Sequence, residues 1–203
     1  MKILAAEFSS SHRSVAVLDS AGAVLGTAVE VNGRSVIALV EQALAQAATQ
    51  REEIDVLAVG LGPGSYTGIR GALALAQGWQ IGRPIKALGV SSVECLAADA
   101  QRAQIFGEVN IVIDAQRKEF YLARFDLAPD SQRLIEPLRL AAFSEIESLA
   151  GRGTLAGPDA RSWFPAAVNL YPTAATVGRL AVGRADFLTA DQLEPIYLRE
   201  PVS

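Results

Sequence analysis

The sequence predicts an α/β protein of two similar lobes, each built on a mixed sheet covered by helices. Residues 2–20 and 109–127 share one pattern: an apolar run ending in an acid, a short polar turn, and a second apolar run. Apolar runs rich in β-branched and aromatic residues around such a turn are typical of β-hairpins. A hairpin at the start of each half indicates duplication, although hairpins are common enough for the likeness to arise by chance. The 203 residues, half of them hydrophobic, can form a sizeable core.

The first half continues with alternating strands and helices after its hairpin. Such alternation following an antiparallel pair implies a mixed sheet with helices packed on it. Ser35, and Ser91 or Ser92, stand where a side-chain oxygen can cap the first turn of a helix. The elements predicted for this half are strands at 23–31, 55–62 and 85–90 and helices at 35–48, 67–80 and 91–101.

The second half is less regular after its hairpin. Residues 143–153 predict a short helix stopped by glycine, and residues 154–159 predict a strand end and a turn. Residues 173–186 predict a helix weakened by Gly178 and Gly183. We therefore expect an N-terminal lobe at 1–103 and a C-terminal lobe at 104–203.

Composition narrows the classes of function. The formal net charge is -4 and no cluster of Lys and Arg occurs, so we expect any contact with RNA to depend on another protein. The single cysteine, Cys95, excludes a disulfide within the chain and is expected to be a buried structural thiol. The first apolar run stops at Glu7, and no apolar run reaches the ~20 residues of a membrane span, so we expect a cytoplasmic protein without signal peptide or membrane contact.

A glycine-rich loop, "GLGPGSYTG", occupies residues 60–68 between a predicted strand and a predicted helix. Gly62 and Gly64 can adopt backbone angles that other residues resist, and Ser65 or Thr67 can cap the helix. Free N–H groups at a helix start attract anions, but the loop lacks the lysine of a P-loop and the glycine spacing of a dinucleotide fingerprint. The loop is thus interpreted as a tight turn, with backbone contact to an anion or a partner as the alternative.

The helix after this loop carries small or apolar residues on both faces. Ile69, Ala72, Leu73 and Ala76 share the face expected to pack on the sheet. A helix that is apolar all round is usually buried or lies at an interface. The surface of this helix and of the preceding one is thus predicted to bind a partner; the alternative is that the second lobe covers it. The candidate partner-binding residues are Val36, Leu39, Arg70, Gly71, Ala74, Leu75 and Gly78.

The residues that usually perform catalysis are scarce. The only histidine is His12, so a two-histidine zinc motif is impossible and a Ser-His-Asp triad is disfavoured. We assign no catalytic residue and no metal ligand. Glu7 and Asp114 end equivalent strands and could face each other to hold a hydrated Mg²⁺, but each acid more simply accepts hydrogen bonds from turn N–H groups. The residues of a residual nucleotide site, if one exists, are Glu7, Gly62, Gly64, Ser65 and Asp114.

Four segments in order resemble the TsaB (YeaZ) family of tRNA threonylcarbamoyladenosine biosynthesis. They are "GLGPGSYTGIRGALALAQGW", "ALGVSSVECLAA", "VIDAQRKEFYLARFD" and "LEPIYLRE", which together span most of the chain. The resemblance implies two similar lobes of the actin/Hsp70/sugar-kinase (ribonuclease H-like) type. The chain departs from the family pattern at Glu7 and Phe8, where an aspartate and a threonine are usual, and at Arg34 and Ser35, where many members carry a histidine.

The resemblance also implies a function through partners. A family member would be a non-catalytic subunit that pairs with a TsaD-like enzyme through helices 35–48 and 67–80, with a TsaE-like ATPase joining the pair. It would form a homodimer when alone and meet tRNA only through the complex. ATP and a metal would be bound by the partner enzyme and no cofactor by this chain. The alternatives are a nucleotide-dependent kinase or ATPase of the same fold and a metallopeptidase, which the single histidine disfavours.

Overall fold

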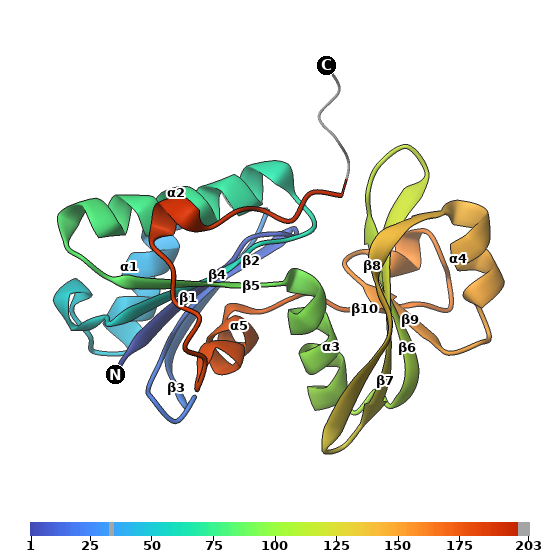
Figure 1. Ribbon diagram of the computed structural model, residues 1–203, viewed down its shortest axis with the longest axis horizontal. Helices are drawn as coiled ribbons and strands as arrows, with labels where there is room; N and C mark the ends of the chain where they lie inside the picture. Colours follow the sequence, from blue (N-terminus) through green and yellow to red (C-terminus); the bar gives the residue numbers. More distant parts are fainter. Residues whose placement is uncertain (33–34, 199–203) are drawn as a thin grey trace. The chain divides into compact units, whose positions relative to one another are not determined.

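The computed structural model describes residues 1–32 and 35–198, which form two compact units (Figure 1). The first unit contains Met1–Ser92 and Pro172–Ile196, and the second contains Val93–Tyr171 together with the chain from Tyr197 onward. Arg34 and the last two residues of the "LEPIYLRE" segment lie outside the described residues.

The first unit holds a five-stranded mixed sheet in the order β3-β2-β1-β4-β5. β1 pairs antiparallel with β2, and β2 with β3, whereas β1–β4 and β4–β5 are parallel. The first predicted hairpin is therefore confirmed as β1 and β2. The strands are β1 (Ile3–Glu7), β2 (His12–Leu18), β3 (Val24–Val31), β4 (Val56–Gly60) and β5 (Lys86–Val90).

The second unit repeats this topology in the order β8-β7-β6-β9-β10. β6 pairs antiparallel with β7, and β7 with β8, while β6–β9 and β9–β10 are parallel. Because order and directions agree in both sheets, the predicted fold of two similar α/β lobes of the actin/Hsp70/sugar-kinase type is confirmed. The strands are β6 (Gly107–Asp114), β7 (Glu119–Ala128), β8 (Ser131–Ala142), β9 (Thr154–Gly157) and β10 (Val168–Asn169).

Helices cover both faces of the first sheet. α1 (Val36–Gln46) and α2 (Tyr66–Gly82) pack on one face, where their apolar residues join those of β1, β2 and β4 in one core cluster. α5 (Ala174–Ala181) contacts β1, β2, β4 and β5, and Figure 1 shows it on the other face. Two short 3-10 helices, η1 (Arg51–Glu53) and η3 (Ala190–Gln192), lie in the connections.

The second sheet is covered by α3 (Ser92–Arg102) and α4 (Phe143–Leu149). Residues of α3 form one apolar cluster with β6 and β7, whereas α4 and η2 (Ala160–Ser162) contribute to a second cluster built on alternate residues of the same strands. Cys95 is fully buried on α3, as predicted.

The return of residues 172–196 to the first unit corrects the predicted boundary between 103 and 104. The amide of Ala174 donates to the buried Ser14 Oγ at 2.9 Å, which fixes the start of α5 against β2. Further along, the Ile196 amide donates to the Leu61 carbonyl at 2.8 Å. Local patterns predicted the helix at 173–186 but carried no sign of which sheet it covers.

Candidate functional site

Two capped helices form the candidate site. Ser35 Oγ accepts a hydrogen bond from the Ala38 amide, and Ser65 Oγ accepts one from the Gly68 amide, both at 3.2 Å. These bonds satisfy N–H groups that the first helical turn leaves free. The predicted inward face of α2 is confirmed, because Ile69, Ala72, Leu73 and Ala76 are all buried. The two helices are therefore anchored by one face each, which leaves their outer surfaces to be explained.

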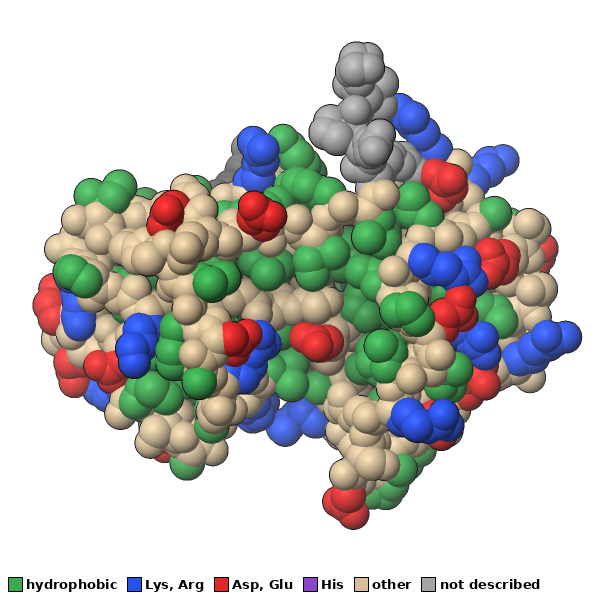
Figure 2. Space-filling model, viewed as in Figure 1, with side chains coloured by type: hydrophobic (Ala, Val, Ile, Leu, Met, Phe, Trp, Pro, Cys, Tyr) green, Lys and Arg blue, Asp and Glu red, His purple; other side chains and the backbone are tan. Residues whose placement is uncertain are grey.

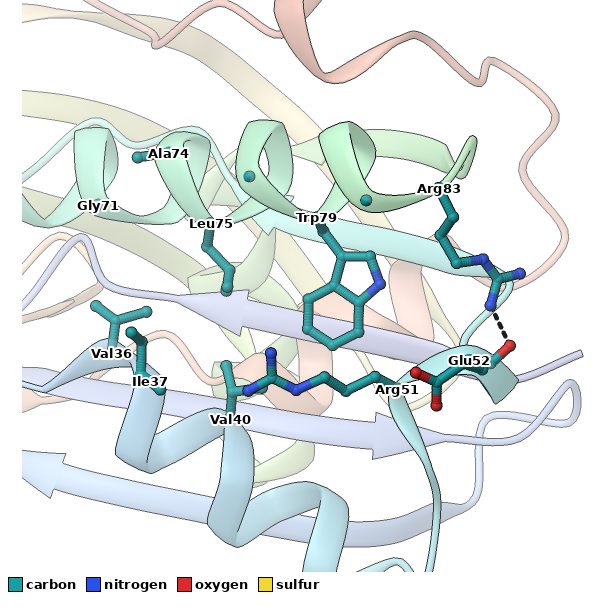
Figure 3. Close-up of a pocket in the computed structure, with 12 residues that line it drawn as sticks. Val36, Ile37, Val40, Arg51, Glu52, Gly71, Ala74, Leu75, Trp79 and Arg83 are labelled. Carbon is teal, nitrogen blue, oxygen red and sulfur yellow. Dashed lines mark hydrogen bonds between the residues drawn. The ribbon is translucent and has the colours of Figure 1, made fainter.

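A groove of about 730 Å³ lies between α1, α2 and η1 (Figure 3). Figure 3 shows Leu75 and Trp79 pointing from α2 toward the first turns of α1. Apolar side chains form its walls, and small residues of α2 border it. The lining residues are Val36, Ile37, Val40, Arg51, Glu52, Gly71, Ala74, Leu75, Gly78, Trp79, Gly82 and Arg83.

The small residues of α2 face open space in the groove. A Cβ placed on Gly78 or Gly82 would meet no atom within 4 Å, and one on Gly71 would only touch Val36 at 3.9 Å. Ile37, at the rim, keeps 63% of its surface exposed. By contrast, the flank of α2 that faces η3 is covered, since Gln80 Oε1 accepts a hydrogen bond from the Ala190 amide at 2.8 Å. Large apolar side chains left open around a glycine-bearing helix are typical of an interaction surface.

Charged groups flank the apolar walls. The Arg51 guanidinium lies 5.7 Å from the centre of the Trp79 ring and 3.5 Å from the Glu41 carboxylate. Arg83 donates a hydrogen bond to the backbone carbonyl of Glu52. On the face of the molecule drawn in Figure 2, basic side chains are interspersed with acidic ones rather than gathered into one basic area.

Most of the predicted partner-binding residues meet at this groove. Val36, Gly71, Ala74, Leu75 and Gly78 line it. Arg70 is exposed on α2, where its guanidinium stacks on the Tyr66 ring at 4.7 Å.

The placement of Leu39 corrects one prediction. Leu39 is only 4% exposed and belongs to the core cluster, because it shares the inward face of α1 with Val40, Ala43 and Leu44. The sequence analysis did not assign Ile37, Trp79 and Gly82 to the surface. The helical period could have identified all three, whereas η1 reaches the groove only through tertiary structure.

The glycine loop packs against the turn between β1 and β2. Gly62 and Gly64 both have positive φ angles, at 85° and 148°. A side chain on Gly64 would collide with the Ser9 carbonyl, which also accepts a hydrogen bond from the Ser65 amide at 2.7 Å. The glycines thus permit a close approach of two backbone segments, which supports the tight-turn interpretation.

Glu7 is fully buried beside this loop. Its Oε1 accepts a hydrogen bond from the Ser9 amide at 2.7 Å, and its Oε2 accepts one from Ser92 Oγ at 2.9 Å. A side chain on Gly60 would collide with the same carboxylate. Glu7 therefore joins the first hairpin to the start of α3, and Phe8 beside it is part of the core.

Asp114 makes the corresponding contact in the second unit. Its Oδ1 accepts a hydrogen bond from the Gln116 amide at 2.7 Å, two residues ahead, as Glu7 does with Ser9. Both acids thus accept hydrogen bonds from the N–H groups of their own turns, which is the simpler of the two predicted roles. Among residues 1–32 and 35–198, no three His, Cys, Asp or Glu side chains gather closely enough to hold a metal ion. No helix within these residues is long and apolar enough to cross a membrane.

The sequence is similar to several known proteins. Residues 28–173 match the family described as "TsaD: tRNA N6-adenosine threonylcarbamoyltransferase". The "tRNA threonylcarbamoyladenosine biosynthesis protein TsaB" of Escherichia coli is 26% identical over 83% of this chain and 80% of its own length. An uncharacterized protein of Mycobacterium tuberculosis is 32% identical over 88% of this chain and 82% of its own length. The solved structure of YeaZ from Pseudomonas aeruginosa superposes with a TM-score of 0.82 and 26% identity, covering 97% of this chain and 99% of that one.

Proposed function

Because this chain belongs to the TsaB (YeaZ) family of tRNA threonylcarbamoyladenosine biosynthesis, we propose that it is a non-catalytic subunit that binds a TsaD-like enzyme through the groove between α1 and α2. The single observation that carries this proposal is the open strip of Gly78 and Gly82 between apolar walls. A second polypeptide can approach the backbone of α2 there without meeting a side chain.

The contacts of the glycine loop support a non-catalytic role. The loop, the β1–β2 turn and the Glu7 carboxylate bond to one another, so the groups that a nucleotide would use are engaged within the chain. The sequence also contains a single histidine, His12, which lies at the start of β2. In this proposal ATP and a metal are bound by the TsaD-like enzyme, and the chain binds no cofactor.

The remaining parts of the proposal concern the assembly. A TsaE-like ATPase joins the pair, and tRNA is met only through the complex, since the net charge of this chain is -4. In the absence of the enzyme, the same apolar groove provides a surface for a homodimer. The complex acts in the cytoplasm, where tRNA is modified.

Substitutions in the groove test the proposal. In co-purification with the TsaD-like subunit of the same organism, Leu75→Glu and Gly78→Arg should each abolish the complex while the monomer stays folded. Each change places charge or bulk where a close helix contact is desolvated. Leu134→Glu is the matched control, because Leu134 is exposed on β8 in the second unit. Complex formation by both groove variants at the wild-type level would refute the proposal.

The nucleotide-dependent kinase or ATPase is separated by a different measurement. Glu7 and Asp114 occupy equivalent strand ends in the two units, as they would in such an enzyme. We expect calorimetry with Mg-ATP to show no micromolar binding by this chain alone. Micromolar binding that Asp114→Ala removes would favour the enzyme.

A further inference from the structure

Three arginines stand around the apolar groove. Arg51 and Arg83 line it near the C-terminal end of α2, while Arg70 is exposed near the N-terminal end of the same helix. Both ends of the helix that borders the groove therefore carry a guanidinium group.

Carboxylates of the chain neutralise this set incompletely. Arg51 pairs with Glu41 at 3.5 Å, and both side chains are more than half exposed. Among the described residues, no carboxylate lies within ion-pair distance of Arg70 or Arg83, whose recorded contacts are the Tyr66 ring and a backbone carbonyl. With Glu41 and Glu52 counted, three arginines face two glutamates. The groove is thus positive on a chain that is negative as a whole.

The shape of α2 indicates a helix as the occupant. Ala74, Gly78 and Gly82 follow one another at intervals of four, which is a row where a helix normally carries a ridge of side chains. Replacing that ridge by small residues leaves a trough that can accept the ridge of another helix at short interaxial distance. An extended strand, by contrast, gains little from such a trough, since neither α1 nor α2 offers it backbone hydrogen-bonding groups.

We propose that the arginines select the occupant: a helix of the TsaD-like subunit that presents carboxylates to Arg51 and Arg83 while its apolar side chains fill the groove. This inference rests on the proposed function and adds the charge of the partner surface to it. Complementary charge around an apolar contact contributes more to partner choice than to affinity.

The same arginines act against a second copy of the chain. In a twofold dimer the same patch meets itself. Because α2 has arginine at both ends, parallel and antiparallel packing of two copies each bring arginine toward arginine. Salt screens both kinds of interaction, so it should weaken the complex with the enzyme and strengthen the homodimer.

The test compares these two salt dependences. Calorimetry of the full chain with the purified TsaD-like subunit at about 50 and 300 mM NaCl should show a Kd that rises with salt. Sedimentation of the chain alone over the same range should show a dimer Kd that falls. The double variant Arg51→Gln/Arg83→Gln should bind the subunit about 2- to 30-fold more weakly at low salt, because an exposed ion pair contributes ~0.2–1 kcal/mol. Arg133→Gln, which alters an exposed arginine on β8, should bind as wild type does.

The outcomes distinguish this inference from the proposed function. An affinity for the subunit that neither salt nor the double variant changes would overturn the role of the arginines, while loss of binding in Leu75→Glu would leave the groove in place. A homodimer that salt weakens would likewise overturn the selection against a second copy. Full binding by Leu75→Glu would instead refute the groove itself. The salt series on the wild-type chain needs no variant, so misfolding of a variant cannot obscure the result.

Discussion

The two units share their strand order and strand directions but differ in the helix between the fourth and fifth strands. In the first unit this connection is α2, with 17 residues, whereas in the second it contains only η2, with three. The connection between the third and fourth strands differs in the same sense, since α1 has 11 residues and α4 has seven. The duplicated sheet is thus a constant scaffold, and the helices on one face distinguish the two units.

The surface chemistry follows this difference. In the second unit Phe120 stacks with Phe143, Phe164 and the edge of Trp163, so the aromatic groups on this face pack on one another. In the first unit Ile37, Leu75 and Trp79 line an open groove instead. One unit therefore uses this face for its own stability, while the other leaves it available for binding.

Charged groups show the same contrast. In the second unit Arg124 and Arg139 bridge three glutamates on β6, β8 and α4: Glu108, Glu136 and Glu145. Around the groove of the first unit, the guanidinium of Arg83 contacts only a backbone carbonyl among its recorded hydrogen bonds. Polar groups that lack carboxylate partners within a unit are better suited to meeting another protein.

Truncation of an aromatic core residue should have the largest effect. Phe120→Ala should lower the free energy of unfolding by about 3–5 kcal/mol, because Phe120 is buried in the second core and its removal leaves a cavity. Leu75→Ala, in the groove, should cost less than about 1.5 kcal/mol, since Leu75 is only partly buried. Urea unfolding monitored by circular dichroism measures both. Equal losses would show that Leu75 belongs to a core rather than to a surface.

The arginine network of the second unit should give a smaller, pH-dependent effect. The hydrogen bonds from Arg139 lower the pKa of Glu136 and of Glu145. A carboxyl whose pKa is lower in the folded chain contributes stability that is present above its unfolded pKa and is lost as pH falls through the folded value. Arg139→Gln should therefore reduce stability at pH 7 by about 1 kcal/mol or less, since these groups are partly exposed.

The difference between the variant and the wild type should also disappear on acidification. Urea unfolding between pH 7 and 3 should show the two curves converging below the ordinary glutamate pKa of 4.5. Arg152→Gln is the control, because Arg152 is exposed and makes no ion pair among the described residues. A difference between Arg139→Gln and the wild type that persists undiminished at pH 3 would contradict the assigned cause.

The smallest expected change has opposite signs for the monomer and the complex. Gly78→Ala should stabilise the isolated chain by about 0.5–1 kcal/mol, because alanine is a better helix former and its Cβ meets no atom. The same methyl group should weaken binding of the TsaD-like subunit, since it enters the space that the partner approaches. Thermal unfolding and calorimetry measure the two effects. Gln77→Ala, one residue earlier and outside the groove lining, should leave the affinity unchanged.

Local patterns in the sequence predicted the periodic elements well. The spacing of Ile69, Ala72, Leu73 and Ala76 identified the inward face of α2, and Ser35 and Ser65 identified helix starts. β8 was not predicted, because it is an exposed edge strand with Pro137 and several charges and so lacks a regular alternation. Leu39 was misassigned because α1 turns its inward face a residue away from the line through Val36.

The hydrophobic period, the repeated hairpins and the capping residues were legible in the chain alone, because each depends on neighbours within a few residues. Only the folded chain revealed that residues 172–196 return to the first unit and that η1 brings Arg51 beneath Trp79. These contacts join residues far apart in the sequence, and no local preference encodes which distant surface a segment will meet. The groove is such a product: its small residues were visible in the sequence, but its depth, its walls and its arginines arise from packing.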